Sequence, residues 1–419
     1  MVPRSTKSPP YHTRRTLLER GAALLGTGML ASTAGCLSAL PPLGRPQSFG
    51  RIDVPASEAP NYRTWVPNPG REDEHPSHGT VVYTEPGRVT TREPDLFLAR
   101  RSNNKVQVDY FGIGYDAFDW LLKTDFGTVI SASLDPTAVG RTLTESGYES
   151  AGTLRGFDRY TRSDTARRAA VSESTIVWSS SRVHDHPDVE RLLRTAAGEN
   201  PRYHEANADF DHLSRAMGAN RLLIVGPNFG DPSGRAVLGA DGFRFDGSVA
   251  FQVIKLLFPE DRGPETTQLE RDFKDQYWTT DEARTFDVRV DGRLGTVETR
   301  VPPQPAQEVT PILDPPQITW GAEYDSAAQA VTIRHEAGDP VDTEWVSYHV
   351  EPVVTADRPG AAGKIELERL WPGTATVRPG DEATIDLSDR PDARRISVDL
   401  AGSAGFRDLF SFDLREAKQ

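Results

Sequence analysis

Cysteine is almost absent from this sequence: among its 419 residues, Cys36 is the only one. A disulfide within one chain is therefore impossible, and no group of thiolates can build a zinc ribbon. The folded part of the chain must obtain its stability from an apolar core and from polar contacts.

Familiar catalytic motifs are missing as well. There is no Gly-x-Ser-x-Gly elbow of an α/β-hydrolase and no Gly-x4-Gly-Lys-Ser/Thr phosphate loop. Gly112-Ile113-Gly114 lacks the following glycine of a dinucleotide fingerprint. The sequence therefore identifies no catalytic residue and no cofactor.

Lysine is scarce, with seven residues, while 61 acidic residues outnumber 48 basic ones. The formal net charge is −13, and a chain that began at Cys36 would carry −17 because five basic residues and one acidic residue precede it. Nucleic acid is therefore not expected as a partner. This acidic, lysine-poor composition resembles that of proteins from salt-loving archaea, where salt screens such a charge.

The first 35 residues have the pattern of an export signal. Arg14 and Arg15 precede two leucines, and an apolar run follows from Gly21 to Ala34. This run of 14 residues is about 21 Å long as a helix, whereas a bilayer core is about 30 Å thick. The paired arginines resemble a twin-arginine (Tat) signal, which exports folded proteins.

The small residues before Cys36 resemble a lipobox, in which the cysteine receives a lipid and the chain is cut just before it. Thr33 departs from this pattern, which usually has leucine or another aliphatic residue there. The alternative is an ordinary signal with a cysteine by chance. The resemblance implies a protein anchored to the outer face of the cytoplasmic membrane, and a lipid on Cys36 leaves no thiolate for a nucleophile or a blue-copper site.

Composition divides the chain into five parts. We expect a signal peptide (1–35), a lipid-bearing flexible tether (36–79), an α+β domain (80–302), a Pro-rich linker (303–316) and a β-sandwich domain (317–415). Within the tether, Tyr62 and Trp65 are too aromatic for a pure linker, and we expect them to dock on the α+β domain.

Clusters of strands separated by helices predict a mainly antiparallel sheet in the α+β domain. Asp135-Pro136 predicts a helix start, and a second helix is expected from His186-Pro187-Asp188-Val189. Leu154 to Tyr160 is expected to form one short strand, and Phe286 to Val301 a hairpin that turns at Asp291-Gly292. The order of elements also suggests an internal duplication.

Residues 60 to 300 resemble a group of haloarchaeal lipoproteins of uncharacterised function. The shared features are Tyr-x-x-Trp followed by Pro-x-Pro (Tyr62 to Pro69) and a Gly-aromatic-x-x-Tyr turn (Gly156 to Tyr160). This resemblance brings no catalytic residues. Seven short strands between Ile318 and Leu414 predict an immunoglobulin-like sandwich, and Val331 to Asp339 resembles a strand and turn of archaeal surface and pilin-type domains.

Histidines offer one weak candidate for a metal site. His184 and His186 are two residues apart, so on a strand both would point to one face, and His204 or His212 could complete the ligand set. The alternative is a solvated loop, because Pro187 and a helix follow directly.

Two other groups could carry chemistry. Asp231, Asp241 and Asp246 lie among glycines and could hold calcium, although their spacing matches no EF-hand; otherwise they are surface turns. His335 beside Glu336 could be an acid–base pair, or His335 a residue at a sandwich edge.

Two functions remain open, and a third, a solute receptor for a transporter, is less favoured because the two similar α/β lobes of such a receptor are not evident in the sequence. The favoured one is a lipid-anchored, non-catalytic binding, adhesion or assembly module at the cell surface, with the membrane and a surface protein as partners. The other is an exported hydrolase or metal-dependent enzyme that uses Asp, Glu and His. It would require a cleft that gathers His184 or His212 with carboxylates of shifted pKa.

Overall fold

Apolar runs without polar alternation form the central strands of this fold. In Leu222-Leu223-Ile224-Val225, neighbouring side chains point to opposite faces of a sheet, so both faces must be covered. The computed structural model describes residues 52–70, 79–87, 89, 92–227, 229–274, 286–301, 308–352, 367–402 and 405–414. All of these belong to one compact unit, Gln47–Gln419.

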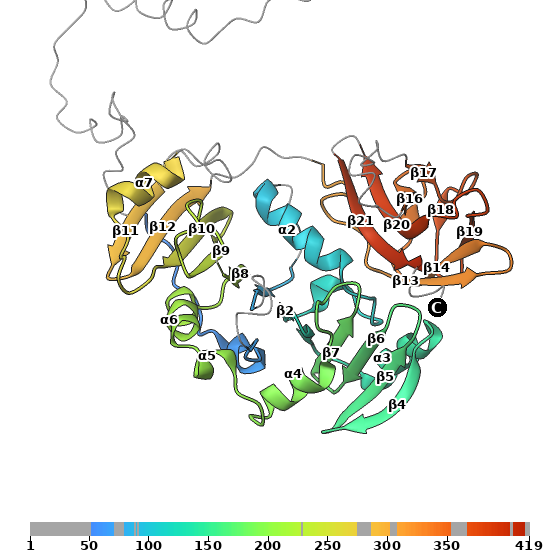
Figure 1. The fold of residues 1–419 in the computed structure, drawn as a ribbon, viewed down its shortest axis with the longest axis horizontal. Helices are drawn as coiled ribbons and strands as arrows, with labels where there is room; N and C mark the ends of the chain where they lie inside the picture. Colours follow the sequence, from blue (N-terminus) through green and yellow to red (C-terminus); the bar gives the residue numbers. More distant parts are fainter. Residues whose placement is uncertain are drawn as a thin grey trace, which may run out of the picture. The chain divides into compact units, whose positions relative to one another are not determined.

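Twelve strands in the described part of the chain form one antiparallel sheet (Figure 1). Their spatial order is β11 (Phe286–Asp291), β12 (Leu294–Val301), β10 (Val249–Leu257), β9 (Leu238–Asp246), β8 (Leu222–Gly226), β1 (Val81–Thr84), β2 (Trp120–Thr124), β3 (Gly127–Ser131), β7 (Thr175–Ser180), β6 (Arg167–Val171), β5 (Phe157–Arg162) and β4 (Glu149–Leu154).

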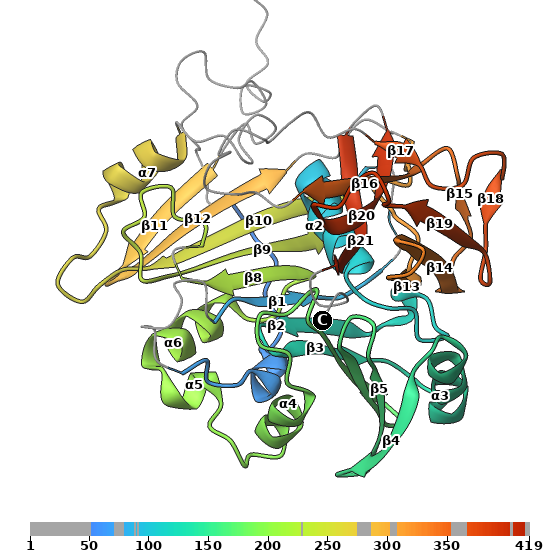
Figure 2. The ribbon, with the colours of Figure 1, turned by 45° about the vertical axis from the view of Figure 1, so that its right-hand side comes forward.

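Helices cover both faces of this sheet (Figure 2). One face is covered by α2 (Asp95–Val106), α3 (Pro136–Glu145) and α7 (Thr266–Lys274). The other is covered by η2 (Asn61–Trp65), α4 (Val189–Ala196), α5 (Tyr203–Ala206) and α6 (Ala208–Met217). A short helix, η3 (Tyr115–Ala117), follows α2. No helix among the described residues is long and apolar enough to cross a membrane.

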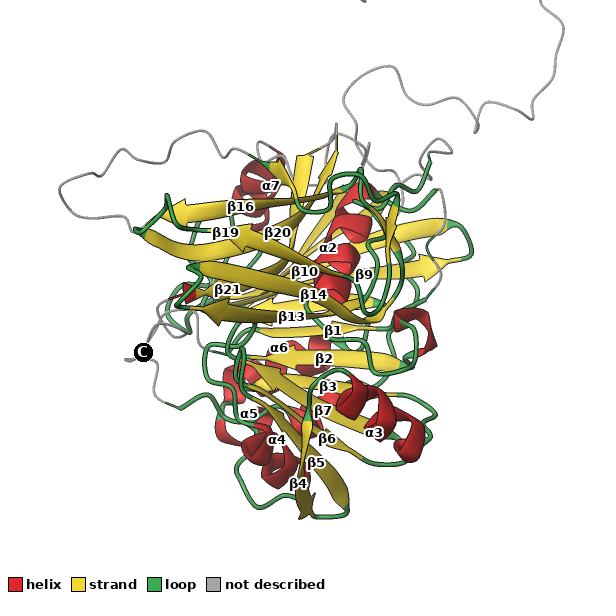
Figure 3. Cartoon of the chain, turned by 90° about the vertical axis from the view of Figure 1, so that its right-hand side faces the viewer, coloured by secondary structure: helices red, strands yellow, loops and turns green. Residues whose placement is uncertain are grey.

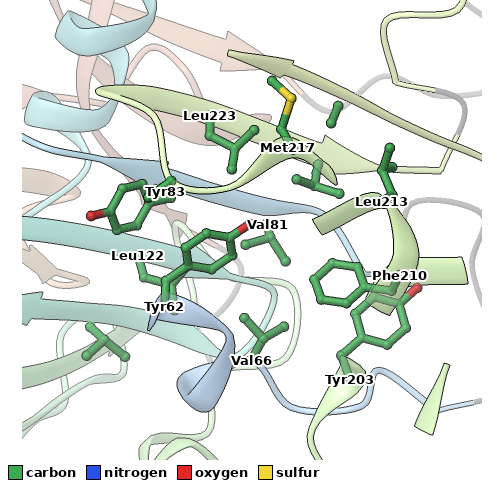
Figure 4. Packing of buried hydrophobic residues seen from close by; sticks show 14 of the residues in the cluster. Tyr62, Val66, Val81, Tyr83, Leu122, Tyr203, Phe210, Leu213, Met217 and Leu223 are labelled. Carbon is green, nitrogen blue, oxygen red and sulfur yellow. The ribbon is translucent and has the colours of Figure 1, made fainter. Parts of the chain in front are cut away.

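The largest core cluster lies under α4 to α6 and η2 (Figure 4). Tyr62 from η2 packs on Tyr83 of β1, with ring centroids 5.0 Å apart, and Tyr203 stacks on Phe210 at 4.1 Å. Each fully buried side chain of this size contributes roughly 1.5–3 kcal/mol. The expected docking of Tyr62 and Trp65 is confirmed, since Tyr62 is buried and Trp65 packs against the same cluster.

Helix α2 crosses the opposite face near the centre of the sheet. Phe97 and Leu98 pack on Leu222 and Phe243. Polar contacts hold its middle and its C-terminal end, because Arg100 pairs with Asp241 of β9 at 2.7 Å and Gln107, just after the helix, accepts a hydrogen bond from Lys123 of β2 at 2.6 Å.

The sheet has two halves with equivalent strand order. The first is β1-β2-β3-β7-β6, with α3 following β3, and the second is β8-β9-β10-β12-β11, with α7 following β10. Strands β1 and β8 pair at the centre, where Val82 lies opposite Ile224. The β4–β5 hairpin is additional to the first half.

The C-terminal part forms smaller antiparallel sheets (Figure 3). One contains β13 (Ile318–Asp325), β14 (Ala330–Gly338) and β19 (Glu382–Asp386), and a second contains β17 (Glu368–Arg369), β16 (Val346–Pro352), β20 (Ala393–Gly402) and β21 (Gly405–Asp413). A short pair joins β15 (Val341–Asp342) and β18 (Thr376–Val377). Apolar residues of these sheets share one core, which includes Trp320, Val331 and Phe410.

A buried ionic network joins this sandwich to the large sheet. Arg167 on β6 pairs with Asp109 at 2.9 Å and donates to the carbonyl oxygen of Trp320 on β13 at 2.8 Å. Arg162 on β5 donates to Glu336 on β14 at 2.9 Å. Buried pairs tolerate the loss of one partner badly, because the remaining charge is then unpaired and desolvated.

The fold is α+β with mostly antiparallel sheets, as the sequence indicated. Helix starts at Asp135 and Asp188 are confirmed: Asp135 accepts from Thr137 N at 3.0 Å and Asp188 from Arg191 N at 2.9 Å.

The single strand expected from Leu154 to Tyr160 is wrong. Arg155 and Gly156, both with positive φ, form a two-residue turn between β4 and β5. Gly156 was the available turn signal, but a non-glycine residue at positive φ hid the hairpin.

Candidate functional site

A pocket of about 300 Å³ lies where the sandwich meets the large sheet; we call it the junction pocket. It is lined by Asn103, Val106 and Gln107 from α2 and its end, Arg182 and Val183 from the turn after β7, and Arg407, Asp408 and Ser411 from β21. Both parts of the fold therefore contribute polar side chains to it.

Arg182 is presented by a tight turn that His184 stabilises. The buried ring of His184 accepts from Ser180 N through Nδ1 at 3.1 Å, and its Nε2 lies 3.0 Å from Thr128 Oγ1. Burial, helped by nearby Lys123, lowers the pKa of His184 to about 3, so the ring is neutral. The residue expected to bind a metal is thus a structural support for the pocket wall.

The guanidinium of Arg182 makes no hydrogen bond or ion pair within the part of the chain that the structure describes. It lies over the ring of Phe410 in a cation–π contact, with Cζ 5.7 Å from the ring centroid. Burial lowers the pKa of Arg182, and the charge of Asp408 opposes that shift. An arginine surrounded by protein without a partner is costly unless something else satisfies its donors.

Asp408, also in the pocket lining, makes no hydrogen bond or ion pair through its side chain among the described residues. It lies opposite Asp399 of β20, next to a bulge between Val398 and Asp399. Although Asp408 is exposed to solvent, the protein packed around it raises its pKa. Arg182 lowers that pKa in turn, yet the two side chains do not form an ion pair.

Asp399, the cross-strand neighbour of Asp408 on β20, is fully buried. Its Oδ2 is 2.7 Å from Nδ1 of His349, while Oδ1 has no partner among the described residues. Burial raises the pKa of Asp399 to about 6, and the carboxylates of Asp408 and Glu351 add to the shift against the opposing effect of His349.

Contacts across the pocket connect the sandwich with α2. Arg407 Nη1 donates to Asn103 Oδ1 at 3.0 Å, and Arg407 Nε donates to the carbonyl oxygen of Ile312 at 3.1 Å. The side-chain oxygens of Asn103 and Gln107 are therefore occupied, and their amide nitrogens are still available as donors.

The structure does not bring the proposed metal-ligand histidines together. His184 is buried, whereas His186 and His212 are exposed, and His204 lies beside Arg63, Arg202 and Asp211. Across the described ranges, no group of three or more His, Cys, Asp or Glu side chains is placed to hold a metal ion. Cys36, Arg14 and Arg15 lie outside the described residues.

The three aspartates considered as calcium ligands have different surroundings in the structure. Asp231 caps its own turn through Ser233, Arg235 and Ala236, and Asp241 is buried against Arg100 and Gln252. Asp246 is exposed at the end of β9. Asp231 and Asp241 therefore serve as structural partners within the fold.

His335 and Glu336 point in different directions. Nε2 of the buried His335 lies 2.8 Å from the carbonyl oxygen of Asp339, whereas Glu336 binds Arg162 across the junction. An acid–base pair needs both groups at one reacting atom, so this pair has the wrong geometry for that role.

A larger pocket of about 430 Å³ lies beside α4, but its charges already have partners. Arg191 donates to the carbonyl oxygen of Asn68 at 2.5 Å and stacks on Phe126 at 3.9 Å, and Asp188 caps the helix. The junction pocket differs because two of its three charged side chains, Arg182 and Asp408, are unpaired among the described residues.

No known protein family matches this chain, and no curated protein is similar to it in sequence. Among solved structures, crystal form I of TP0453 matches 59% of this chain and 94% of its own, with 10% identity and a TM-score of 0.36. Crystal form III of TP0453 matches 54% and 92%, with 10% identity and a TM-score of 0.33.

Proposed function

We propose that this protein is an exported, lipid-anchored and non-catalytic binding module at the outer face of the cytoplasmic membrane. The observation that carries the binding role is the junction pocket, in which the side chains of Arg182 and Asp408 have no hydrogen-bond or ion-pair partner in the described ranges. Unpaired charges in a preformed pocket are a feature of ligand sites. The pocket lies where two parts of the fold meet, which keeps its walls in fixed positions.

A non-catalytic role is supported by the state of the histidines. No histidine lines the junction pocket, and Nδ1 of nearby His349 is bonded to Asp399 while Nε2 faces Glu351 at 3.6 Å. A nucleophile in this pocket would need a base within hydrogen-bond reach in the same wall. The pairing of a nucleophile with a base is thus missing from the pocket wall.

The proposed location of the protein is argued from the sequence. Arg14 and Arg15 resemble a Tat signal and Cys36 a lipobox cysteine, so the proposed partners are the membrane, through the lipid, and a protein at the cell surface. Adhesion or assembly through such a partner fits the same location. The acidic composition supports a haloarchaeal origin.

The sandwich is proposed to be immunoglobulin-like. Its sheets β13-β14-β19 and β17-β16-β20-β21 have the order of strands A-B-E and C′-C-F-G in that architecture. The equivalent strand orders around Val82 and Ile224 support an internal duplication of the α+β part.

A second candidate is an exported hydrolase or metal-dependent enzyme with an unrecognised Asp/Glu/His site. The observation in its favour is the raised pKa of Asp399 and Asp408 beside a pocket, because such shifts are common in acid–base sites. It differs from the first candidate in that a bound ligand would be chemically changed.

Anchoring is tested with the native protein, a Cys36→Ser variant and a variant with Arg14 and Arg15 changed to lysine. Intact mass should show a chain that starts at Cys36 with added lipid, and Cys36→Ser should appear in the medium. A cytoplasmic chain that still carries residues 1–35 would refute export and lipid anchoring.

Binding is tested by denaturing the purified native protein and an Arg182→Gln variant and comparing the small molecules released. The native protein should release a compound that the variant lacks. Identical released molecules would contradict a ligand site in the junction pocket, and conversion of the released compound on incubation would favour the enzyme.

A further inference from the structure

We propose that the junction pocket binds a small zwitterion with one carboxylate and one ammonium group, of the size of a free amino acid. This inference rests on the proposed binding function and names its ligand class. The carboxylate would lie against Arg182 and the ammonium against Asp408.

The Arg182 side of the pocket is suited to a carboxylate. A guanidinium offers a fork of donors that matches the two oxygens of a carboxylate, and all of these donors are unused among the described residues. Asn103 and Gln107 line the same pocket, and their amide nitrogens can donate as well. Neutral donors beside a guanidinium favour an anion without adding further charge.

The Asp408 side is suited to an ammonium group. When ionised, its carboxylate carries a negative charge and only accepts hydrogen bonds, and the hydroxyl of Ser411 in the same wall is a second acceptor. The protein around Asp408 favours its neutral form, so a bound cation would replace the solvation that the carboxylate has lost.

A ligand of one charge fits this pocket less well. A simple anion at Arg182 would meet the carboxylate of Asp408, and a simple cation at Asp408 would meet Arg182 and Arg407. A dipolar ligand satisfies both groups, and its own charges cancel. The volume of about 300 Å³ restricts it to a small molecule.

Local contacts hold the backbones that carry the two charges. Arg182 lies in the turn that His184 stabilises, and Asp408 lies in the ladder of β20 and β21 beside the bulge. The backbone on both sides of the pocket is therefore in place before a ligand enters, which lowers the ordering cost of binding.

The experiment is calorimetric titration of the purified full chain with glycine, L-alanine, β-alanine and 4-aminobutyrate, which differ in the separation of their charges. Propionate and ethylamine are matched controls, because each is alanine without one charged group. At least one zwitterion should bind, and propionate and ethylamine should bind about tenfold more weakly or not at all.

Variants test whether Arg182 and Asp408 bind the two charged groups of the ligand. Arg182→Gln and Asp408→Asn should each weaken zwitterion binding by about tenfold or more. Arg168→Gln and Asp158→Asn, which change exposed residues of β6 and β5, should leave it unchanged. Circular dichroism checks that each variant is folded, and the comparison of alanine with propionate and ethylamine needs no variant.

The outcomes separate this inference from the proposed function. If propionate or ethylamine binds as tightly as the zwitterions and Arg182→Gln removes that binding, the ligand class is wrong and the binding site stands. If no panel compound binds, but the native protein releases a non-zwitterionic compound that Arg182→Gln lacks, the class is again wrong. If no compound binds and both proteins release the same molecules, both proposals fail.

Discussion

His349 Nδ1 lies 2.7 Å from Oδ2 of the fully buried Asp399. Asp399 is the cross-strand neighbour of Asp408, which lines the junction pocket. His349 and Asp399 lie on neighbouring strands of the sandwich, β16 and β20, on the side opposite to its apolar core. The pair therefore connects the electrostatics of the pocket wall with the stability of the sandwich.

The raised pKa of Asp399 predicts a pH-dependent contribution to stability. Because its folded pKa of about 6 exceeds the unfolded value of about 3.8, the folded state binds the proton more tightly, and this contribution is lost as pH rises from about 4 to 6. Asp399→Asn keeps an acceptor for His349 and removes the charge. Its free energy of unfolding should exceed that of the native protein by roughly 2 kcal/mol at pH 7, with no gain below pH 4.

Urea unfolding of both proteins between pH 3.5 and 8 measures this difference in the free energy of unfolding. The test is how the difference changes with pH. A variant that is destabilised equally at pH 4 and pH 7 would show that the buried carboxylate carries no such cost.

Loss of Arg167 should destabilise the junction strongly. Arg167→Met leaves Asp109 and Asp164 without their buried partner, so the free energy of unfolding should fall by about 3–5 kcal/mol. Arg168→Gln on the same strand is exposed and should change it by less than about 0.5 kcal/mol. Denaturant unfolding measures both; equal effects would contradict the role of the ionic network.

His184 should act in stability without a metal. His184→Ala removes the hydrogen bonds to Ser180 and Thr128 and should lower the free energy of unfolding by about 1–3 kcal/mol. His212→Ala, at an exposed position of α6, should have almost no effect. The melting temperature of the native protein should be the same with EDTA and with added Zn²⁺; a shift with either would restore the metal hypothesis.

Gly239 should not tolerate a side chain. A Cβ there would lie 1.6 Å from the carbonyl oxygen of Phe229, so Gly239→Ala requires the loop after β8 to move. We expect a loss of more than about 2 kcal/mol by overpacking. Gly114→Ala, with open space and negative φ, is the control. Similar unfolding midpoints for the two variants would argue against this close packing.

The acidic composition predicts dependence on salt. A chain from Cys36 carries a formal charge of −17, and screening of that charge should stabilise the folded state. The melting temperature should rise between low and multimolar KCl. A flat response would count against the prediction.

Local chemistry in the sequence was sufficient for several elements. Asp135 and Asp188 predict helix starts because a side-chain cap involves only neighbours in the chain. Helix α2 was missed because its buried side includes Arg101 and Lys105, whose charges are paired with Asp314. Such a helix has no apolar stripe that periodicity could detect.

The sequence by itself determined the near absence of thiols and catalytic motifs and the α+β class with mostly antiparallel strands, and it predicts an export signal at the N-terminus. Only the tertiary structure decided the candidate site. Arg182 and Asp408 are distant in the chain, and no local signal marks either of them. Desolvation and the lack of a partner arise only when the sandwich docks on the sheet, because both depend on which distant atoms surround a charge.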